Sequence, residues 1–198
     1  MTTIAPVPPT TSPPLTPADV ARLSDEHGKL YELVDGRLVE KPMGKQSLWV
    51  ASRINHLLQT VYPPSKAFVF LEPPTYCFPG RRHGRRPDVA MVWAERAGST
   101  PDDEELQIAP DLVVEVVSPS NTFLDQFERV EEYLKAGVPL VWLVEPVYRS
   151  VHVYRKDGSV SLLHETDVVK DEPLLPGLVL PVAEFFAGVP KRTPEPQS

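Results

Sequence analysis

The chain contains 198 residues, with 20 basic and 27 acidic side chains, 24 prolines and one cysteine. This length is enough for one domain of ordinary size with short flanking segments. A single cysteine excludes a disulfide framework and a zinc site built from cysteines. The net charge of −7 argues against a protein that coats nucleic acid through bulk electrostatics, although a small basic patch could still contact phosphate.

Proline is concentrated at the start of the chain. Six of the first seventeen residues are prolines, mixed with threonine and serine, and such a segment favours extended, solvated conformations. We therefore predict a disordered, proline-rich segment over residues 1–15, one domain over 16–190 and a flexible tail over 191–198. No apolar run approaches the roughly 18 residues that cross a bilayer. The N-terminus also lacks the basic and apolar blocks of a secretory signal, so we expect a cytoplasmic protein with no membrane partner.

The domain opens with a helix and a hairpin. Thr16 can cap a helix that begins at Pro17, because threonine accepts a backbone hydrogen bond and proline suits the first helical position. The pair Asp35-Gly36 then separates two β-type runs, 30–34 and 37–40. An Asp-Gly pair in this place predicts a tight hairpin, because glycine accepts the positive φ of the turn.

The rest of the domain alternates helices and strands. One helix is predicted over 46–61, with an apolar face made of Leu48, Ala51, Ile54, Leu58 and Val61. Another is predicted over 122–136, with an apolar stripe made of Phe123, Phe127, Val130 and Leu134. Strand-like runs occupy 67–71, 89–93, 112–117, 141–144, 151–154 and 160–163, and a last short helix occupies 182–186. A strand–helix–strand unit between hairpins predicts an α/β fold with a mixed sheet.

The strand-like run 112–117 carries an acid among apolar residues. Alternate strand residues face opposite ways, so Glu115 shares a face with Val113 and Val117. Both faces are apolar, so we expect a central strand in which Glu115 is buried. An ionised carboxylate there needs a positive partner, protonation or a metal ion. The residues alone leave a structural ion pair with an arginine or lysine as an alternative.

Two further acids stand next to β-type runs. Asp88 directly precedes the run 89–93, and by itself it would be interpreted as a residue that accepts hydrogen bonds from nearby backbone. Asp88 and Glu115 on neighbouring strands could instead share a divalent cation, since magnesium prefers carboxylate oxygen and keeps several waters. Glu32 lies in the middle of an apolar strand, and a partly exposed hairpin acid is the alternative for it.

Several blocks, taken in order, resemble a known family. They are Tyr31-Glu32-Leu33-Val34-Asp35-Gly36, Arg86-Pro87-Asp88-Val89 and Pro110-Asp111-Leu112-Val113-Val114-Glu115-Val116-Val117-Ser118-Pro119-Ser120, followed by Tyr133, Gly137-Val138-Pro139 and Trp142-Leu143-Val144. In order and spacing they are similar to the Uma-type putative restriction endonucleases, a bacterial group within the PD-(D/E)XK nuclease superfamily. The resemblance covers about residues 30–187.

The resemblance implies a restriction-endonuclease-like fold, in which helices flank a mixed β-sheet, and an endonuclease that hydrolyses DNA phosphodiester bonds. It implies that Asp88 and Glu115 bind Mg²⁺ or Mn²⁺, joined by the backbone carbonyl of Val116, and that Glu32 is a further catalytic acid near the ion or its water. The metal would polarise the phosphate and lower the pKa of an attacking water. DNA is then the expected partner. Related nucleases often pair to cut two strands, so a homodimer is one alternative for the oligomeric state.

Three positions depart from the family pattern. Val117 stands where the superfamily signature has lysine, Arg129 stands where the Uma group usually has lysine, and Ser47 stands where many relatives have histidine. Arginine can bind a phosphate oxygen and offset developing charge, so Arg129 is assigned a catalytic role, but it stays protonated and cannot act as a general base. The alternative for Arg129 is a surface ion pair with Asp125, four residues earlier.

A dense basic segment directly precedes Asp88, and it contains Arg81, Arg82, Arg85 and Arg86. We predict that these arginines contact substrate phosphate, together with Tyr133, which lies one helical turn beyond Arg129. The alternatives are a solvated loop for the arginines and packing on the sheet for Tyr133. The loop 118–122 could bind an anion, but helix capping explains it more simply.

Two other functions stay open on the sequence alone. A nuclease-fold module that binds nucleic acid or a protein partner without cutting is favoured by Val117, Arg129 and Ser47. A structural or assembly role, with the acids buried in ion pairs, is the second.

Overall fold

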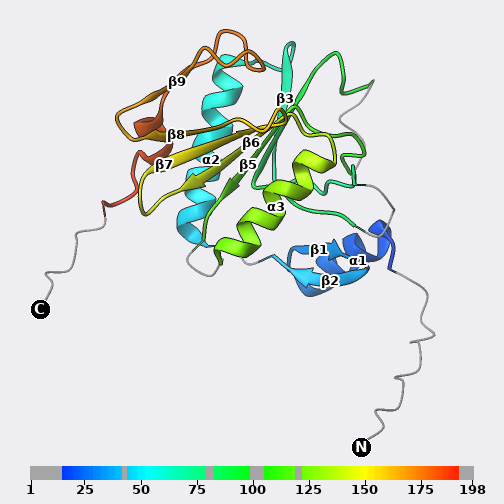
Figure 1. Ribbon diagram of the computed structural model, residues 1–198. Helices are drawn as coiled ribbons and strands as arrows, with labels where there is room; N and C mark the ends of the chain where they lie inside the picture. Colours follow the sequence, from blue (N-terminus) through cyan, green and yellow to red (C-terminus); the bar gives the residue numbers. More distant parts are fainter. Residues whose placement is uncertain (1–14, 42–43, 79–82, 99–104, 119–121, 192–198) are drawn as a thin grey trace, which may run out of the picture.

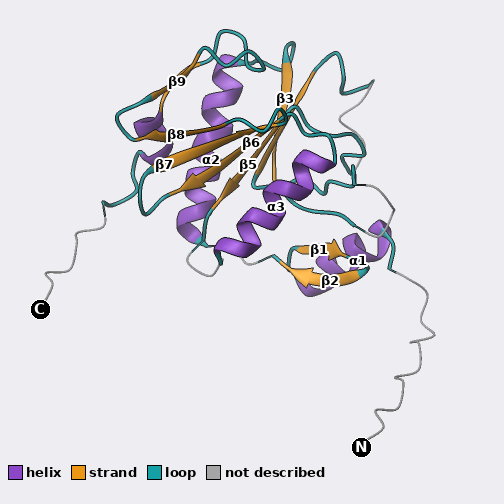
Figure 2. Ribbon diagram, in the orientation of Figure 1, coloured by secondary structure: helices purple, strands orange, loops and turns teal. Residues whose placement is uncertain are grey.

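The computed structural model describes residues 15–41, 44–78, 83–98, 105–118 and 122–191. Its centre is a six-stranded sheet in the order β3-β4-β5-β6-β7-β8 (Figure 2). The strands are β3 (Ala67–Leu71), β4 (Val89–Trp93), β5 (Leu112–Val116), β6 (Leu140–Glu145), β7 (Ser150–Arg155) and β8 (Val160–His164). Only β5 and β6 pair in parallel within this sheet, so the predicted mixed sheet is confirmed. The segment predicted as disordered and the C-terminal tail lie almost wholly outside the described residues.

Helices α2 (Lys45–Val61) and α3 (Phe123–Lys135) cover opposite faces of the sheet (Figure 1). Helix α3 connects β5 to β6, as a parallel pair of strands requires a crossover. The short 3₁₀ helix η1 (Val182–Phe186), predicted from the sequence, packs on the same face as α2. No helix in the described part of the chain is long and apolar enough to span a membrane.

Strand β5 is buried on both faces, which confirms the central strand expected from its sequence. Leu112, Val114 and Val116 pack in the core beneath α2, and Val113 packs in the smaller core beneath α3. Glu115 shares the face of Val113 by alternation. The acid therefore lies under helix α3, the element that carries Arg129 and Tyr133.

The hairpin of β1 (Tyr31–Val34) and β2 (Arg37–Glu40) forms a separate two-stranded sheet beside α1 (Pro17–His27) (Figure 1). Asp35 and Gly36 both have positive φ, 49° and 77°, as expected of a tight turn between the strands. The hairpin is attached to the segment before β4 by two backbone hydrogen bonds between Leu33 and Gly84, of 3.0 and 2.7 Å. Another small sheet, β9 (Val168–Lys170) with β10 (Val179–Pro181), was not predicted.

Two residues of the predicted helical stripes point outward. Leu48 is 41% exposed and Phe127 is 45% exposed, so their placement in the apolar faces was wrong. The buried faces instead include polar side chains, Asn55 in α2 and Gln126 in α3. Polar residues that turn inward cannot be found from hydrophobic periodicity, which assigns the inner face to apolar residues alone.

Candidate active site

Glu115 is buried in the middle of β5, with 4% of its surface exposed. Its Oε1 accepts a hydrogen bond from the Tyr133 hydroxyl at 2.8 Å and one from Arg129 Nη1 at 3.3 Å. Its other oxygen, Oε2, takes part in no hydrogen bond with the described residues. Burial raises the pKa of Glu115, and the charge of Arg129 opposes that rise only in part. The ion pair with an arginine that the sequence left open is therefore present, and in the described part of the chain it engages only one of the two Glu115 oxygens.

Asp88 connects the hairpin to the central strand. Its Oδ2 accepts a hydrogen bond from the backbone N–H of Val116 at 2.6 Å, directly beside Glu115 in β5. Its Oδ1 accepts a hydrogen bond from Lys41 Nζ at 2.6 Å. Asp88 thus accepts a hydrogen bond from nearby backbone, as its position before a strand suggested, and is also placed next to the second acid of the predicted pair.

Lys41 is a residue of this site that the sequence analysis missed. It follows the last residue of β2, and only 8% of its side chain is exposed. Besides Asp88, its Nζ donates to the carbonyl oxygen of Arg86 at 2.5 Å and lies 3.8 Å from a carboxylate oxygen of Glu72. Burial lowers the pKa of Lys41, but the nearby charges of Asp88 and Glu115 outweigh it and raise that pKa, so the group is an ammonium ion.

The pairing of residues across the hairpin could have indicated Lys41 as a site residue. Glu32 pairs with Val39 across the hairpin, so their side chains share a face. Lys41 lies two residues beyond Val39, and strand alternation extended by one residue past Glu40 places it on that same face. The local pattern could therefore have grouped Lys41 with Glu32, though not with Asp88.

Glu32 is 2% exposed, which excludes the alternative of a partly exposed hairpin acid. Arg129 binds both of its oxygens, at 2.8 and 3.0 Å, and Arg85 Nη1 and the backbone N–H of Arg86 donate to them at 3.0 and 2.9 Å. Burial by itself would raise the pKa of Glu32, but the charges and hydrogen bonds of these arginines lower that pKa to about 2. The hairpin packs against helix α3 and the segment before β4, and this packing buries a carboxylate that an isolated edge strand would leave exposed.

Arg129 pairs with two acids distant in sequence. Its guanidinium contacts Glu32 and Glu115, whereas Asp125 accepts the backbone N–H of Thr122 in the capping box that begins α3. The surface pair with Asp125 is thus not the arrangement found, and helix capping by Thr122 is confirmed. The same arginine holds the hairpin acid and the central-strand acid, which fixes where α3 lies on the sheet.

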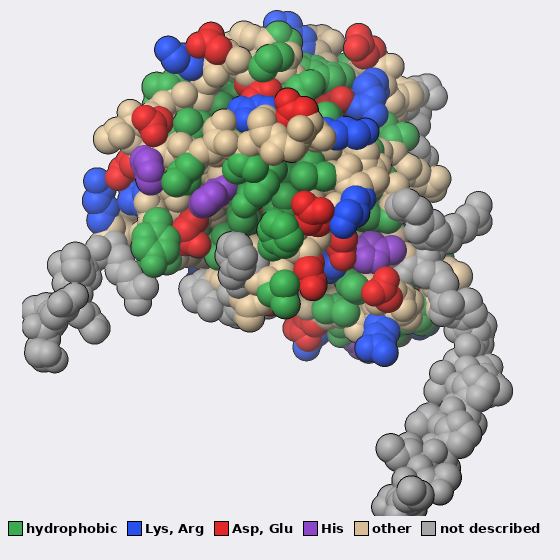
Figure 3. Space-filling model, viewed as in Figure 1, with side chains coloured by type: hydrophobic (Ala, Val, Ile, Leu, Met, Phe, Trp, Pro, Cys, Tyr) green, Lys and Arg blue, Asp and Glu red, His purple; other side chains and the backbone are tan. Residues whose placement is uncertain are grey.

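The described part of the basic segment is engaged in hydrogen bonds within the protein. Arg85 donates to Glu132 through Nε and Nη2, at 2.7 and 2.9 Å. Arg86 donates to the carbonyl oxygens of Tyr31 and Glu72, each at 3.2 Å. Arg81 and Arg82 lie outside the described residues. On the face viewed in Figure 3, acidic and basic side chains are interspersed, in keeping with the acidic net charge.

A small cavity of about 30 Å³ lies between Asp88, Glu115 and Arg129. Glu32 does not line it, and neither does Tyr133. The side chains and backbone that do line it are Lys41, Ser47, Asp88, Glu115, Val116, Ser118, Gln126 and Arg129. This volume holds about one water molecule or one small ion.

The oxygen atoms around this cavity fit a hard divalent cation. Asp88 and Glu115 supply carboxylates, and the buried amide oxygen of Gln126 has no hydrogen-bond partner among the described residues. Magnesium is commonly held by one or two carboxylates and several waters. A closed cage of three or more His, Cys, Asp or Glu side chains does not occur among the described residues, so such an ion would complete its shell with water or substrate oxygen.

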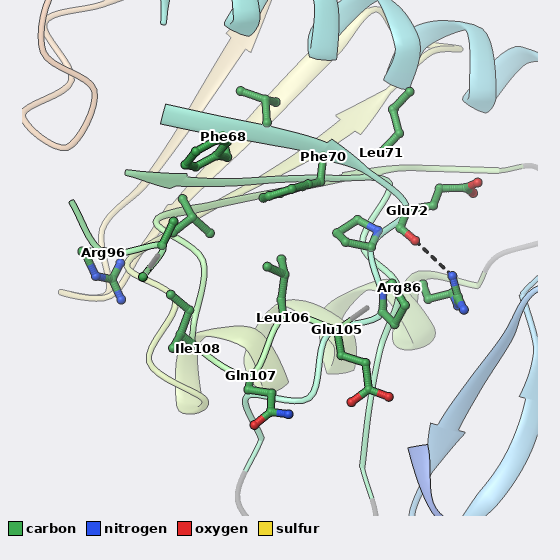
Figure 4. Close-up of a pocket in the computed structure, with 16 residues that line it drawn as sticks. Phe68, Phe70, Leu71, Glu72, Arg86, Arg96, Glu105, Leu106, Gln107 and Ile108 are labelled. Atoms are coloured by element: carbon green, nitrogen blue, oxygen red, sulfur yellow. Dashed lines mark hydrogen bonds between the residues drawn. The ribbon is translucent and has the colours of Figure 1, made fainter. Parts of the chain in front are cut away.

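A larger cavity of about 770 Å³ lies along the outer strand β3 (Figure 4). Phe68 and Phe70 line it with their rings stacked at 6.2 Å, and Arg86 donates to the Glu72 carbonyl at one end. Neither Asp88 nor Glu115 lines this cavity. Size alone would favour it as a binding site, but the paired carboxylates place the candidate chemistry in the smaller one.

Comparison with known proteins agrees with this architecture. A crystal structure of a putative nuclease belonging to DUF820 from Anabaena variabilis superposes with a TM-score of 0.74 over 88% of this chain and 98% of that one, at 23% identity. The mixed six-stranded sheet of this chain, with its flanking helices, therefore has the same fold as that putative nuclease. No curated protein matches the chain. The model of a family described as Uma2, putative restriction endonuclease, matches residues 17–183. The chain therefore belongs to the Uma2 family of putative restriction endonucleases.

Proposed function

We propose that the protein is a metal-dependent endonuclease that hydrolyses DNA phosphodiester bonds, with Asp88 and Glu115 as the ligands of Mg²⁺ or Mn²⁺. The family and the fold support a nuclease. The observation that carries the metal assignment is that both carboxylates line one cavity, and that Asp88 is hydrogen-bonded to the strand that carries Glu115.

The residues at and next to that cavity have different roles in the proposed reaction. A bound divalent ion supplies polarisation of the phosphate and a water of lowered pKa. Arg129 lines the cavity and stays positively charged, so it can offset charge that develops on the phosphate, but it cannot remove a proton. Tyr133 donates to Glu115 and holds that carboxylate in place.

Glu32 acts through Arg129 in this proposal. Both of its oxygens are occupied by arginine and backbone donors, and it does not line the cavity. We therefore assign Glu32 a positioning role: it fixes the guanidinium of Arg129 beside Glu115. Arg129 is the preferred phosphate contact because it lines the cavity, whereas Arg85, Arg86 and Tyr133 do not.

Cleavage of supercoiled plasmid with Mg²⁺ or Mn²⁺ tests the proposal. Asp88→Asn and Glu115→Gln keep side-chain shape and remove the charge that binds the ion, and each should lower the cleavage rate by about 100-fold or more. Glu172→Gln is the matched control, because Glu172 is also a buried carboxylate, paired with Arg155 at 2.8 Å, but lies outside the cavity. Cleavage that survives both active-site changes would reject the assignment.

A nuclease-fold module that binds DNA without cutting is the second candidate. The observation in its favour is that both cavity carboxylates already contact cations of the chain, Lys41 and Arg129. Arg129→Lys separates the two functions when plasmid cleavage is measured beside DNA binding. Cleavage gained by this variant indicates a weakened enzyme, whereas unchanged binding with no cleavage in either protein favours the module.

A further inference from the structure

The ammonium group of Lys41 contacts Asp88, one of the two carboxylates that line the small cavity. It touches Asp88 Oδ1 at 2.6 Å and the carbonyl oxygen of Arg86 at 2.5 Å, with a Glu72 carboxylate oxygen 3.8 Å away. Lys41 also lines the cavity that contains Glu115. A positive charge with oxygen neighbours on several sides resembles the environment of a bound metal ion.

Each oxygen of the Asp88 carboxylate already accepts a hydrogen bond from a described residue. Its Oδ2 is already bonded to the backbone N–H of Val116 at 2.6 Å, within the buried strand. Its Oδ1 is the atom that Lys41 holds. A divalent ion that binds Asp88 through Oδ1 would share this atom with the Lys41 ammonium, and the two positive charges would repel each other at that distance.

We propose that Lys41 is a tethered cation that occupies the metal position on Asp88, so that divalent-ion binding requires displacement of its ammonium group and Lys41 sets the metal affinity of the site. This inference rests on the proposed function for the nature of the ligand. What it adds to the proposed function is that Lys41, the residue after strand β2, controls metal binding.

Displacement of Lys41 is geometrically simple. Lysine carries a compact charge on a flexible stem of four carbons, and Glu72, 3.8 Å away, offers a second carboxylate to which the ammonium can move. Arg129 differs in this respect, because two of its nitrogens are fixed on the two oxygens of Glu32. Of the two described cations that line the cavity, Lys41 is the one that can leave.

Direct binding of MnCl₂, followed by electron paramagnetic resonance of free Mn²⁺ in the absence of DNA, tests the proposal. Lys41→Met keeps an unbranched side chain and removes the competing charge. We expect it to bind Mn²⁺ about tenfold to a hundredfold more tightly than the wild type, because no charge-assisted hydrogen bond must be broken. The double variant Lys41→Met/Asp88→Asn should lose this gain.

Lys29→Met is the matched control for charge. Lys29 also makes a 2.7 Å ion pair, with Glu40 of the same hairpin, but it is half exposed and does not line the cavity. We expect no change in its Mn²⁺ affinity. An equal gain in both single variants would show a general effect of charge and would overturn the proposal.

The outcomes separate this inference from the function on which it rests. If Lys41→Met binds Mn²⁺ no more tightly than a wild type that does bind it, the inference is wrong and the proposed metal site stands. If neither protein binds Mn²⁺ at millimolar concentration, both are wrong.

A measurement on the wild type avoids dependence on the folding of a variant. Reductive methylation followed by mass spectrometry reports how accessible each lysine amine is. Lys41 should label slowly in the metal-free protein, where only 8% of its side chain is exposed, and several-fold faster when Mn²⁺ is present. Unchanged labelling of Lys41 in protein saturated with Mn²⁺ would contradict displacement.

Discussion

Arg129 Nη1 lies 2.8 Å from Glu32 Oε1, and this contact joins helix α3 to a hairpin residue 97 positions earlier in the chain. The same nitrogen is 3.3 Å from Glu115 Oε1 in the central strand. One guanidinium thus connects the hairpin, the helix and the six-stranded sheet. Because the two acids are buried, the arginine is a structural requirement as well as a candidate for substrate contact.

Arg129→Met should strongly destabilise the protein. The change leaves Glu32 and Glu115 without their shared cation, and removal of one partner from a buried ion pair costs about 3–5 kcal/mol. Urea unfolding at neutral pH measures the loss. Arg22→Met is the control, because Arg22 pairs with Glu26 at 2.9 Å on an exposed helix surface, where solvent screening leaves such pairs little effect on stability. Similar losses in the two variants would contradict the buried role of Arg129.

Glu32→Gln should reduce the dependence of stability on pH. The folded protein holds the pKa of Glu32 at about 2, below its ordinary value of 4.5. A depressed pKa favours the folded state when the group is ionised, so this stabilisation is present above about pH 4.5 and is lost as the pH falls towards 2. The full shift corresponds to about 3 kcal/mol.

Urea unfolding at pH 6 and pH 3 tests this prediction for Glu32. Of that stabilisation, about 2 kcal/mol should disappear from the wild type between these two pH values. The glutamine variant lacks this contribution, and its free energy of unfolding should change by about 2 kcal/mol less over the same interval. Equal changes in both proteins would show that Glu32 is not ionised and paired as described.

Tyr133→Phe should lower the free energy of unfolding more than Tyr62→Phe, which removes a hydroxyl with a neutral acceptor. The hydroxyl of Tyr133 is buried and donates to the Glu115 carboxylate at 2.8 Å, and a hydrogen bond to a charged group contributes about 1.5–3 kcal/mol. Tyr62→Phe is the control, since the Tyr62 hydroxyl donates to a neutral acceptor, the carbonyl oxygen of Pro176, at 3.2 Å. That variant should lose only about 0.5–1.5 kcal/mol. The reverse order in thermal or urea unfolding would mean that Glu115 is not held as an anion.

Thr122→Ala should weaken the start of α3 without removing any group that lines the cavity. Thr122 and Asp125 form a reciprocal capping box, and loss of such a cap costs about 1 kcal/mol. Thr16→Ala removes the same kind of cap from α1, where Asp19 is the partner, and should cost a similar amount. Both variants should keep the Mn²⁺ affinity of the wild type, and a large loss of affinity in Thr122→Ala alone would assign that residue to the site itself.

The sequence predicted the sheet better than the site. Alternation in the run 112–117 identified a central strand with a buried acid, and Asp35-Gly36 identified the hairpin, because both signals act within a few residues. The position of Asp88 before a strand indicated an acceptor of backbone hydrogen bonds, but it did not identify the N–H of Val116 as the donor. The partners of Glu32 could not be predicted, because Arg85 and Arg129 reach it from 53 and 97 residues away. Lys41 was missed for the same reason: its contact with Asp88 spans 47 residues.

The hairpin of β1 and β2 forms a sheet that is separate from the central one, and it contributes Glu32 from β1 and positions Lys41, the residue that follows β2. Its backbone attachment at Leu33 and Gly84 consists of two hydrogen bonds. Local opening of this attachment would dismantle the charged network while the six-stranded ladder stayed intact, which is a subglobal transition rather than unfolding. Amide hydrogen exchange at Leu33 and Gly84 therefore measures how often the hairpin detaches from the segment before β4.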